Sequence, residues 1–142
     1  FQIFVTGLTT RSFLVGIAVV NVAFLREALR SRGDLARYAD QPIEKLLSES
    51  DVRRFVLQEL NRIGKEKGLQ SIELIKGIHL IHEELTAESG LVTPTLKLRR
   101  HLLKQKFAKE IDLLFTEEKH CSRCYSHLFY DCRKCFIMNK CL

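Results

Sequence analysis

Lys97 has the sequence neighbours of a residue that could act in electrostatic catalysis. It lies in the run Gly90–Arg100, where Pro94 fixes the backbone just ahead of a basic, helix-forming stretch. Thr93 and Thr95 add hydroxyl groups to the same loop. A lysine at such a loop-to-helix junction can neutralise negative charge that develops on a phosphate or a carboxylate. The same pattern also describes a solvated lysine that merely precedes a helix.

A second group with chemical potential is the set of five cysteines, all of which lie between Cys121 and Cys141. Two Cys-x-x-Cys pairs could bind zinc through the thiolates of Cys121, Cys124, Cys132 and Cys135, with His127 as a further ligand. The gap between the pairs is shorter than in usual zinc ribbons, and helical periodicity is weak. We therefore expect residues 119–142 to be an unstructured tail without a metal. Zinc binding and S-acylation at a membrane are the alternatives.

Glycines, acidic residues and a Thr-Pro-Thr-Leu-Lys motif follow one another through residues 60–100. The members of this pattern are Gly64-Lys65-Glu66, Gly68-Leu69, Glu73, Lys76, Ile78, Leu80, Glu88, Gly90-Leu91, Thr93 to Lys97, and Arg99 or Arg100. In this pattern the segment resembles the C-terminal domain of the long-chain fatty acyl-CoA synthetases, which are adenylate-forming enzymes. The apolar segments at 2–5 and 12–17 also look like that family, so the resemblance covers about residues 2–115.

The resemblance implies a mobile lid in an enzyme that joins a fatty acid to coenzyme A with Mg²⁺ and ATP. Lys97 matches the family's catalytic lysine, in a Thr-Pro-Thr-Leu-Lys motif that is specific to the eukaryotic long-chain branch. Thr95, Arg99 and Arg100 are implied contacts to phosphate or CoA. The implied partner is the N-terminal adenylation domain, with fatty acid and CoA as substrates. We expect no cofactor to be tightly bound to this chain alone.

Much of that enzyme's machinery is missing from this sequence, which has no phosphate-binding loop, adenine pocket or acyl tunnel. We therefore expect a lid-like domain over residues 1–118 that is incomplete at its N-terminus, lacks the hinge and is inactive alone. The family's usual His-Pro-Glu-Pro-Phe is replaced by Ile-His-Glu-Glu-Leu at residues 81–85. The loss of both prolines predicts a looser loop ahead of Lys97.

The composition is that of a soluble globular chain, with 46% hydrophobic and 28% charged residues and a net charge of +6. The positive charge suits nucleotide phosphates, coenzyme A, nucleic acid or an acidic membrane, without choosing among them. The longest apolar run, at 12–25, is too short to span a membrane. A body without cysteines fits a reducing compartment, so we expect a cytosolic location. The resemblance implies that complete family members associate with endoplasmic reticulum, mitochondrial outer or peroxisomal membranes.

The elements that must position Lys97 follow from hydrophobic spacing. Strands are expected at 2–6 and 12–19, joined by a hairpin loop, and again at 74–81. Helices are expected from the N-cap Asn21 to about Gly33, at 42–47, at 51–67 after the N-cap Ser50, and at 98–115. Residues 34–41 read as a surface connection. This order predicts an α+β fold in which helices pack on a small sheet, as in the lid of adenylate-forming enzymes.

The last expected helix has two faces with different roles. Its core stripe is Leu103, Phe107, Ile111 and Leu114, and its other face carries Arg99, Arg100, Lys104, Lys106 and Lys109. Those cations could steer phosphates or could simply be solvated. His79 and His82 read as ordinary strand and loop histidines.

Two rival functions stay open from the residues. One is a non-catalytic interaction module that keeps the lid fold. The other is a zinc-stabilised, basic nucleic-acid binder built on the tail and the last helix. No recognised nucleic-acid motif is present, so we expect no nucleic-acid partner.

Overall fold

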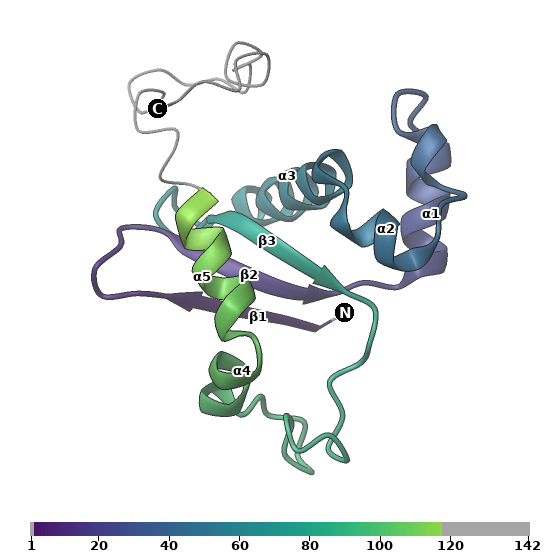
Figure 1. The fold of residues 1–142 in the computed structure, drawn as a ribbon. Coiled ribbons are helices and arrows are strands. Elements are labelled where there is room, and N and C mark those ends of the chain that lie inside the picture. Colours follow the sequence, from purple (N-terminus) through teal and green to yellow (C-terminus); the bar gives the residue numbers. More distant parts are fainter. Residues whose placement is uncertain (1, 118–142) are drawn as a thin grey trace.

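A three-stranded sheet lies at the centre of the computed structural model, which describes residues 2–117 (Figure 1). Its strands are β1 (Gln2–Gly7), β2 (Leu14–Val19) and β3 (Ile75–Ile81), in the spatial order β1-β2-β3. β1 and β2 pair antiparallel through the predicted hairpin, whereas β2 and β3 pair in parallel. A parallel pair needs a long crossover connection, and the chain between β2 and β3 supplies it.

Helices occupy that crossover and the chain after β3. The crossover contains α1 (Val22–Arg30), a 3-10 helix (Ala36–Tyr38), α2 (Ile43–Ser48) and α3 (Ser50–Glu66). The chain after β3 forms α4 (Arg100–Lys106) and α5 (Ala108–Glu117). Figure 1 shows α5 crossing the sheet, with α1, α2 and α3 together on the other side. The predicted α+β fold is therefore confirmed.

Each face of the sheet has its own apolar core, because successive strand residues point to opposite faces. Ala18, Ile78 and Leu80 pack with residues of the crossover helices such as Leu29 and Leu46. The opposite core joins three strand residues, Phe4, Val15 and Ile17, to Leu103 of α4 and Ile111 of α5. Burying a large aliphatic or aromatic side chain contributes about 1.5–3 kcal/mol, so the two layers stabilise one another through the sheet.

An irregularity in β3 brings α5 close to the sheet. Leu14 pairs with Ile75, but the next residue, Val15, pairs with Gly77. Gly77 faces α5, and a Cβ atom placed on it would lie 3.3 Å from Leu114 Cδ2 and 3.5 Å from Val15 Cγ1. The absence of a side chain at this position therefore lets α5 approach the strand. Side chains further along β3 keep the alternation, which directs His79 toward the same helix.

The segment 34–41, predicted to be a surface connection, is partly a core segment. Leu35, Tyr38 and Ala39 are buried, and the Tyr38 hydroxyl donates a hydrogen bond of 2.7 Å to Asp51 Oδ2 at the start of α3. Arg37 donates to the same hydroxyl at 2.8 Å. Leu35, Tyr38 and Ala39 follow helical spacing, but the run is short and lies between Asp34 and Asp40, so the sequence pattern alone did not reveal their burial.

Two helix predictions also need correction. Ser50 is the first residue of α3, Glu49 is its N-cap, and no side chain caps this end. The predicted helix 98–115 is two helices, because Phe107 takes the values φ −104° and ψ 25° between α4 and α5. The predicted stripe is nevertheless right, since Leu103, Phe107, Ile111 and Leu114 are all buried.

Residues 2–117 contain neither a membrane-spanning helix nor a cluster of metal-binding side chains. No helix in that range has the length and apolar character needed to cross a membrane. The same range holds no cluster of three or more His, Cys, Asp or Glu side chains that could bind a metal ion. The zinc alternative rests on Cys121, Cys124, Cys132 and Cys135, which lie outside the described residues.

Deletion of residues 119–142 should leave the thermal unfolding of the chain little changed, within about 2 °C. The physical reason is that both apolar cores are complete by Phe115. The measurement is circular dichroism melting of the full and shortened chains, each with and without a chelator. A large loss on deletion, matched by chelation of zinc from the full chain, would instead indicate a structural thiolate site.

Candidate functional site

Lys97 lies in a loop whose two ends are joined by backbone hydrogen bonds. Val92 and Leu98 form an isolated antiparallel bridge, and Arg99 N donates to Leu91 O at 2.8 Å. Leu91 and Val92 are themselves buried in the core that α5 covers. The loop is therefore anchored in the folded domain just beside the candidate lysine.

Thr93 organises the tip of this loop. Its backbone N–H donates to Lys97 O at 2.9 Å, and its carbonyl accepts from Leu96 N at 2.8 Å. Its hydroxyl accepts from Lys97 N at 3.0 Å and lies 3.0 Å from the Thr95 hydroxyl. Thr95 thus helps to build the loop, and its predicted contact with phosphate stays a prediction.

The other end of the segment between β3 and α4 is tied to β1. Gln2 Nε2 donates to Leu85 O at 3.0 Å, and Leu85 N donates to Gln2 Oε1 at 2.8 Å. Leu85 is buried in the same core as Leu91. This reciprocal pair holds the loop at the position where the family's prolines are missing, so it provides an anchor that the sequence pattern did not suggest.

The Lys97 side chain extends into solvent and forms no ion pair with any residue of the described part of the chain. A fixed backbone and a free ammonium group are what a lysine needs to reach a charge on a partner. The preceding residue, Leu96, has φ +60° and is 79% exposed. The loop therefore presents one apolar and one cationic side chain next to each other.

The neighbouring arginines are placed differently from one another. Arg100 donates to Val5 O at 3.1 Å, and its guanidinium lies 5.8 Å from the centroid of the Phe4 ring. It lines a shallow hollow beside β1 together with Lys104. Arg99 is exposed and precedes α4. The structure thus holds Arg100 at β1, while Arg99 stays free to meet a partner.

The predicted cationic face is divided between two edges of the domain. Arg100 and Lys104 lie at the β1 hollow, but Lys106 lines a separate cleft beside β3. The break at Phe107 accounts for part of this separation, because it changes the direction of the chain between α4 and α5. A single continuous stripe of cations is therefore not formed.

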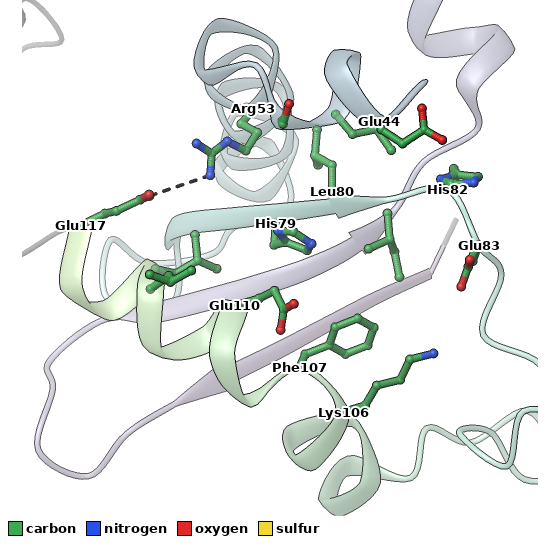
Figure 2. Close-up of a pocket in the computed structure, with 15 residues that line it drawn as sticks. Glu44, Arg53, His79, Leu80, His82, Glu83, Lys106, Phe107, Glu110 and Glu117 are labelled. Carbon is green, nitrogen blue, oxygen red and sulfur yellow. Dashed lines mark ion pairs between the residues drawn. The ribbon is translucent and has the colours of Figure 1, made fainter. Parts of the chain in front are cut away.

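The cleft beside β3 has a volume of about 560 Å³ and lies between α5 and the helices α2 and α3 (Figure 2). His79 of β3, Arg53 of α3 and Glu110 of α5 extend into it. Arg53 Nε and Glu110 Oε2 are buried and have no hydrogen-bond partner among the described residues. Arg53 also forms an ion pair with Glu117, with 3.8 Å between Nη1 and Oε2. His82 also lines the cleft.

Sequence reasoning missed Arg53 and Glu110 as cleft residues. Glu110 is three residues after Phe107 and four before Leu114, which places it on the border of the core stripe. Arg53 likewise follows the buried Val52. The position of each charged residue next to a buried apolar residue was the sequence feature that could have indicated a partly buried charge. That both residues line one cleft depends on the tertiary fold, which brings α3 and α5 to the same edge of β3.

Burial lowers the pKa of His79 below its ordinary value. Arg53 acts in the same direction by charge repulsion, whereas the carboxylate of Glu110 raises the pKa and offsets part of the shift. The net effect favours the neutral imidazole in the folded chain. His79 is therefore a half-buried histidine with charged neighbours from two helices.

Several long-chain acyl-CoA ligases are similar in sequence to this chain. Long-chain-fatty-acid–CoA ligase 6 of Homo sapiens is 36% identical over 115 residues, which cover 81% of this chain and 16% of the ligase. Ligase 5 of Mus musculus is 37% identical over 114 residues, covering 80% and 16%. Long chain acyl-CoA synthetase 2 of Arabidopsis thaliana is 34% identical over 118 residues, covering 83% and 17%.

This chain is a homologue of one segment of the long-chain-fatty-acid–CoA ligases. The resemblance drawn from the motifs is thereby confirmed at the level of the family. The chain spans about 16% of the length of the ligases from human and mouse. The roles of Lys97, Thr95, Arg99 and Arg100 stay predictions. No protein-family profile matches the chain.

Solved structures show the same fold. The adenylation domain of a carboxylate reductase from Mycobacterium chelonae matches with a TM-score of 0.61 at 24% identity, over 81% of this chain and 15% of that one. The A-PCP didomain of a carboxylic acid reductase from Segniliparus rugosus, in complex with AMP, matches with a TM-score of 0.61 at 23% identity, over 84% and 14%. These likenesses agree with the α+β assignment.

Replacing His79 by Gln should reduce the loss of folding stability on acidification. Because the pKa of His79 is lowered in the folded state, the unfolded chain binds more protons as the pH falls below about 6.5, and stability decreases there. Urea unfolding of both chains between pH 7.5 and pH 5 measures the difference. The control is His101→Gln, at an exposed position on α4. An equal decrease in the parent and His79→Gln would contradict the assignment.

Proposed function

We propose that residues 1–118 act as the lid domain of a long-chain fatty acid–CoA ligase and that Lys97 is its catalytic residue. Residues 119–142 are a separate tail in this proposal. The observation that supports it best is the anchored loop that presents the free side chain of Lys97 within the Thr-Pro-Thr-Leu-Lys motif. The homology to the ligases supplies the reaction class.

In the proposed first step, a fatty acid carboxylate oxygen attacks the α-phosphorus of ATP. The bond from that phosphorus to the pyrophosphate oxygen breaks, and acyl-adenylate and pyrophosphate are released. Negative charge spreads over the carboxylate and phosphate oxygens in the transition state. The Lys97 ammonium, placed between them in a cleft without water, lowers the barrier by roughly a few kcal/mol.

In the second step, the thiol of CoA attacks the acyl carbonyl and AMP leaves. Lys97 is not needed at that carbonyl, so the lid withdraws the lysine and presents another face. Arg99 is an exposed cation beside the loop. We assign it to the binding of a phosphate of CoA or ATP. Arg100 keeps its bond to Val5 and its assignment is weaker, since a phosphate would have to compete with that carbonyl.

The remaining groups of the reaction lie outside this chain in our proposal. Residues 2–117 offer no cluster suited to Mg²⁺, so no step is assigned to a metal held here. ATP, fatty acid and CoA are substrates that bind mainly to the N-terminal adenylation domain, which is the proposed partner. We place the chain in the cytosol, because residues 1–120 contain no cysteine that would need an oxidising compartment.

The isolated chain should form no acyl-CoA. The sites for the nucleotide and for the fatty acid lie on the proposed partner, and an exposed lysine alone stabilises little charge in water. The measurement is palmitoyl-CoA formation by the purified chain with ATP, Mg²⁺, palmitate and CoA, against a complete ligase as the positive control. Robust turnover that survives further purification would overturn the lid assignment.

Grafted in place of the lid of a complete long-chain ligase, this chain should restore activity that depends on Lys97. Lys97→Ala should lower the adenylation rate by about 10²–10³-fold, because the charge is needed where the transition state is negative. Transfer from preformed acyl-adenylate to CoA should fall much less. Pyrophosphate exchange and thioester formation measure the two steps.

Lys45→Ala is the matched control, since Lys45 is an exposed lysine on α2. It should leave both steps unchanged. If the graft folds and docks but stays inactive, the chain is better described as an interaction module with a lid fold. An equal loss of both steps in Lys97→Ala would show that Lys97 has no special role in adenylation.

A further inference from the structure

Leu96 combines two unusual properties at the tip of the Lys97 loop. Its φ is +60°, and it is the only residue other than glycine with a positive φ among residues 2–117. Its side chain is 79% exposed, the highest value for a large apolar residue in that range. Leucine rarely adopts the left-handed region, which suits glycine or asparagine better. The packing of the domain therefore does not stabilise a leucine at this position.

The backbone conformation at Leu96 is fixed by its neighbours and does not depend on the leucine side chain. Leu96 N donates to Thr93 O at 2.8 Å, and Lys97 N donates to the Thr93 hydroxyl at 3.0 Å. Thr93 N closes the loop on Lys97 O at 2.9 Å. The backbone consequently directs the side chain outward, beside the lysine. Residues held in sparsely populated conformations occur where function requires them.

The outer surface of the loop tip has a definite chemical character. The Thr93 and Thr95 hydroxyls are occupied by contacts within the loop. What the tip offers to a partner is the apolar side chains of Pro94 and Leu96 and the ammonium of Lys97. Such a tip is complementary to an apolar protein wall that lies next to an anionic group.

We infer that Leu96 is a positioning residue that seats the loop in an apolar hollow of the adenylation domain. This inference rests on the proposed function of the lid. Contact of Leu96 with the wall fixes how far Lys97 enters the site, while the lysine supplies the charge. We assign this contact to the protein wall and not to the acyl chain, because the adjacent Lys97 acts at the carboxylate and the phosphate, which form the polar end of the substrate.

The test uses the full chain grafted onto a long-chain ligase and three substitutions at one position. Leu96→Asn keeps the left-handed backbone but replaces the apolar side chain with a polar one. Leu96→Gly removes the side chain. Leu96→Met keeps an apolar side chain of similar size. Melting of the ungrafted chains comes first, and Leu96→Asn and Leu96→Gly should unfold at the parent temperature or above it.

In the graft, Leu96→Asn and Leu96→Gly should lower the adenylation rate by about tenfold, the loss expected when a buried leucine contact is removed. Leu96→Met should remain within about threefold of the parent. Transfer from preformed acyl-adenylate to CoA should change little, which a general folding defect would not allow. The loss should be the same with octanoate and with palmitate.

The outcomes separate this inference from the proposed function. If the parent graft depends on Lys97 but Leu96→Asn is fully active, the role of Leu96 is wrong and the lid assignment stands. A loss of activity seen with palmitate alone would indicate that Leu96 contacts the acyl chain. The proposed contact with the protein wall would then be wrong. A parent graft in which Lys97→Ala has no effect would overturn the proposed function, and the inference with it.

Discussion

The burial of β2 on both faces is the constraint on which the rest of the domain depends. Val15 and Ala18 have no exposed surface, and Ile17 is 1% exposed, although these residues point to opposite sides of the sheet. A strand of this kind is stable only when both sides are covered by other elements. The crossover helices α1, α2 and α3 cover one side, and α4 and α5 cover the other. The chain must therefore pass from one layer to the other between β3 and α4.

That passage is where the candidate lysine is found. The segment from 82 to 99 leaves β3 and meets β1 through Gln2 and Leu85 before it enters the core again at Leu91. Each net hydrogen bond of this kind contributes about 0.5–1.5 kcal/mol, and the buried Leu85 and Leu91 contribute more. The loop is consequently held by the sheet and by α5 together. Its position is a result of the two-layer arrangement rather than of local turn chemistry alone.

The sequence predicted the features that depend on short-range patterns. Alternating or continuous apolar residues located β1, β2 and β3, and helical spacing located α3 and the stripe from Leu103 to Leu114. The motif around Lys97 correctly indicated the ligase family. The burial of Tyr38 and the break at Phe107 could not be predicted this way. Each depends on the distant residues against which that part of the chain packs.

Contacts between distant residues explain what else was missed in the candidate site. The Gln2–Leu85 pair joins residues separated by 83 positions, and the Arg100–Val5 bond joins residues separated by 95. No local pattern reports such contacts. The first anchors the loop that follows β3 to β1, at the position where the sequence lacks the family's two prolines. The second removes Arg100 from the group of free cations that the sequence alone placed beside Lys97.

The exposure of Lys97 fits a residue whose effect depends on closure. Two unit charges 4 Å apart interact by about 1 kcal/mol in bulk water, but by about 4 kcal/mol at an effective dielectric constant near 20, as at a protein surface. An ammonium group that stays hydrated in the free lid therefore gains strength only when a partner excludes water around it. A lid with a rigid loop and a long, free lysine side chain meets both needs, since the backbone fixes the approach while the side chain follows the developing charge. The same reasoning explains why the apolar neighbour matters: a wall contact at Leu96 would exclude water at the point where the charge of Lys97 has to act.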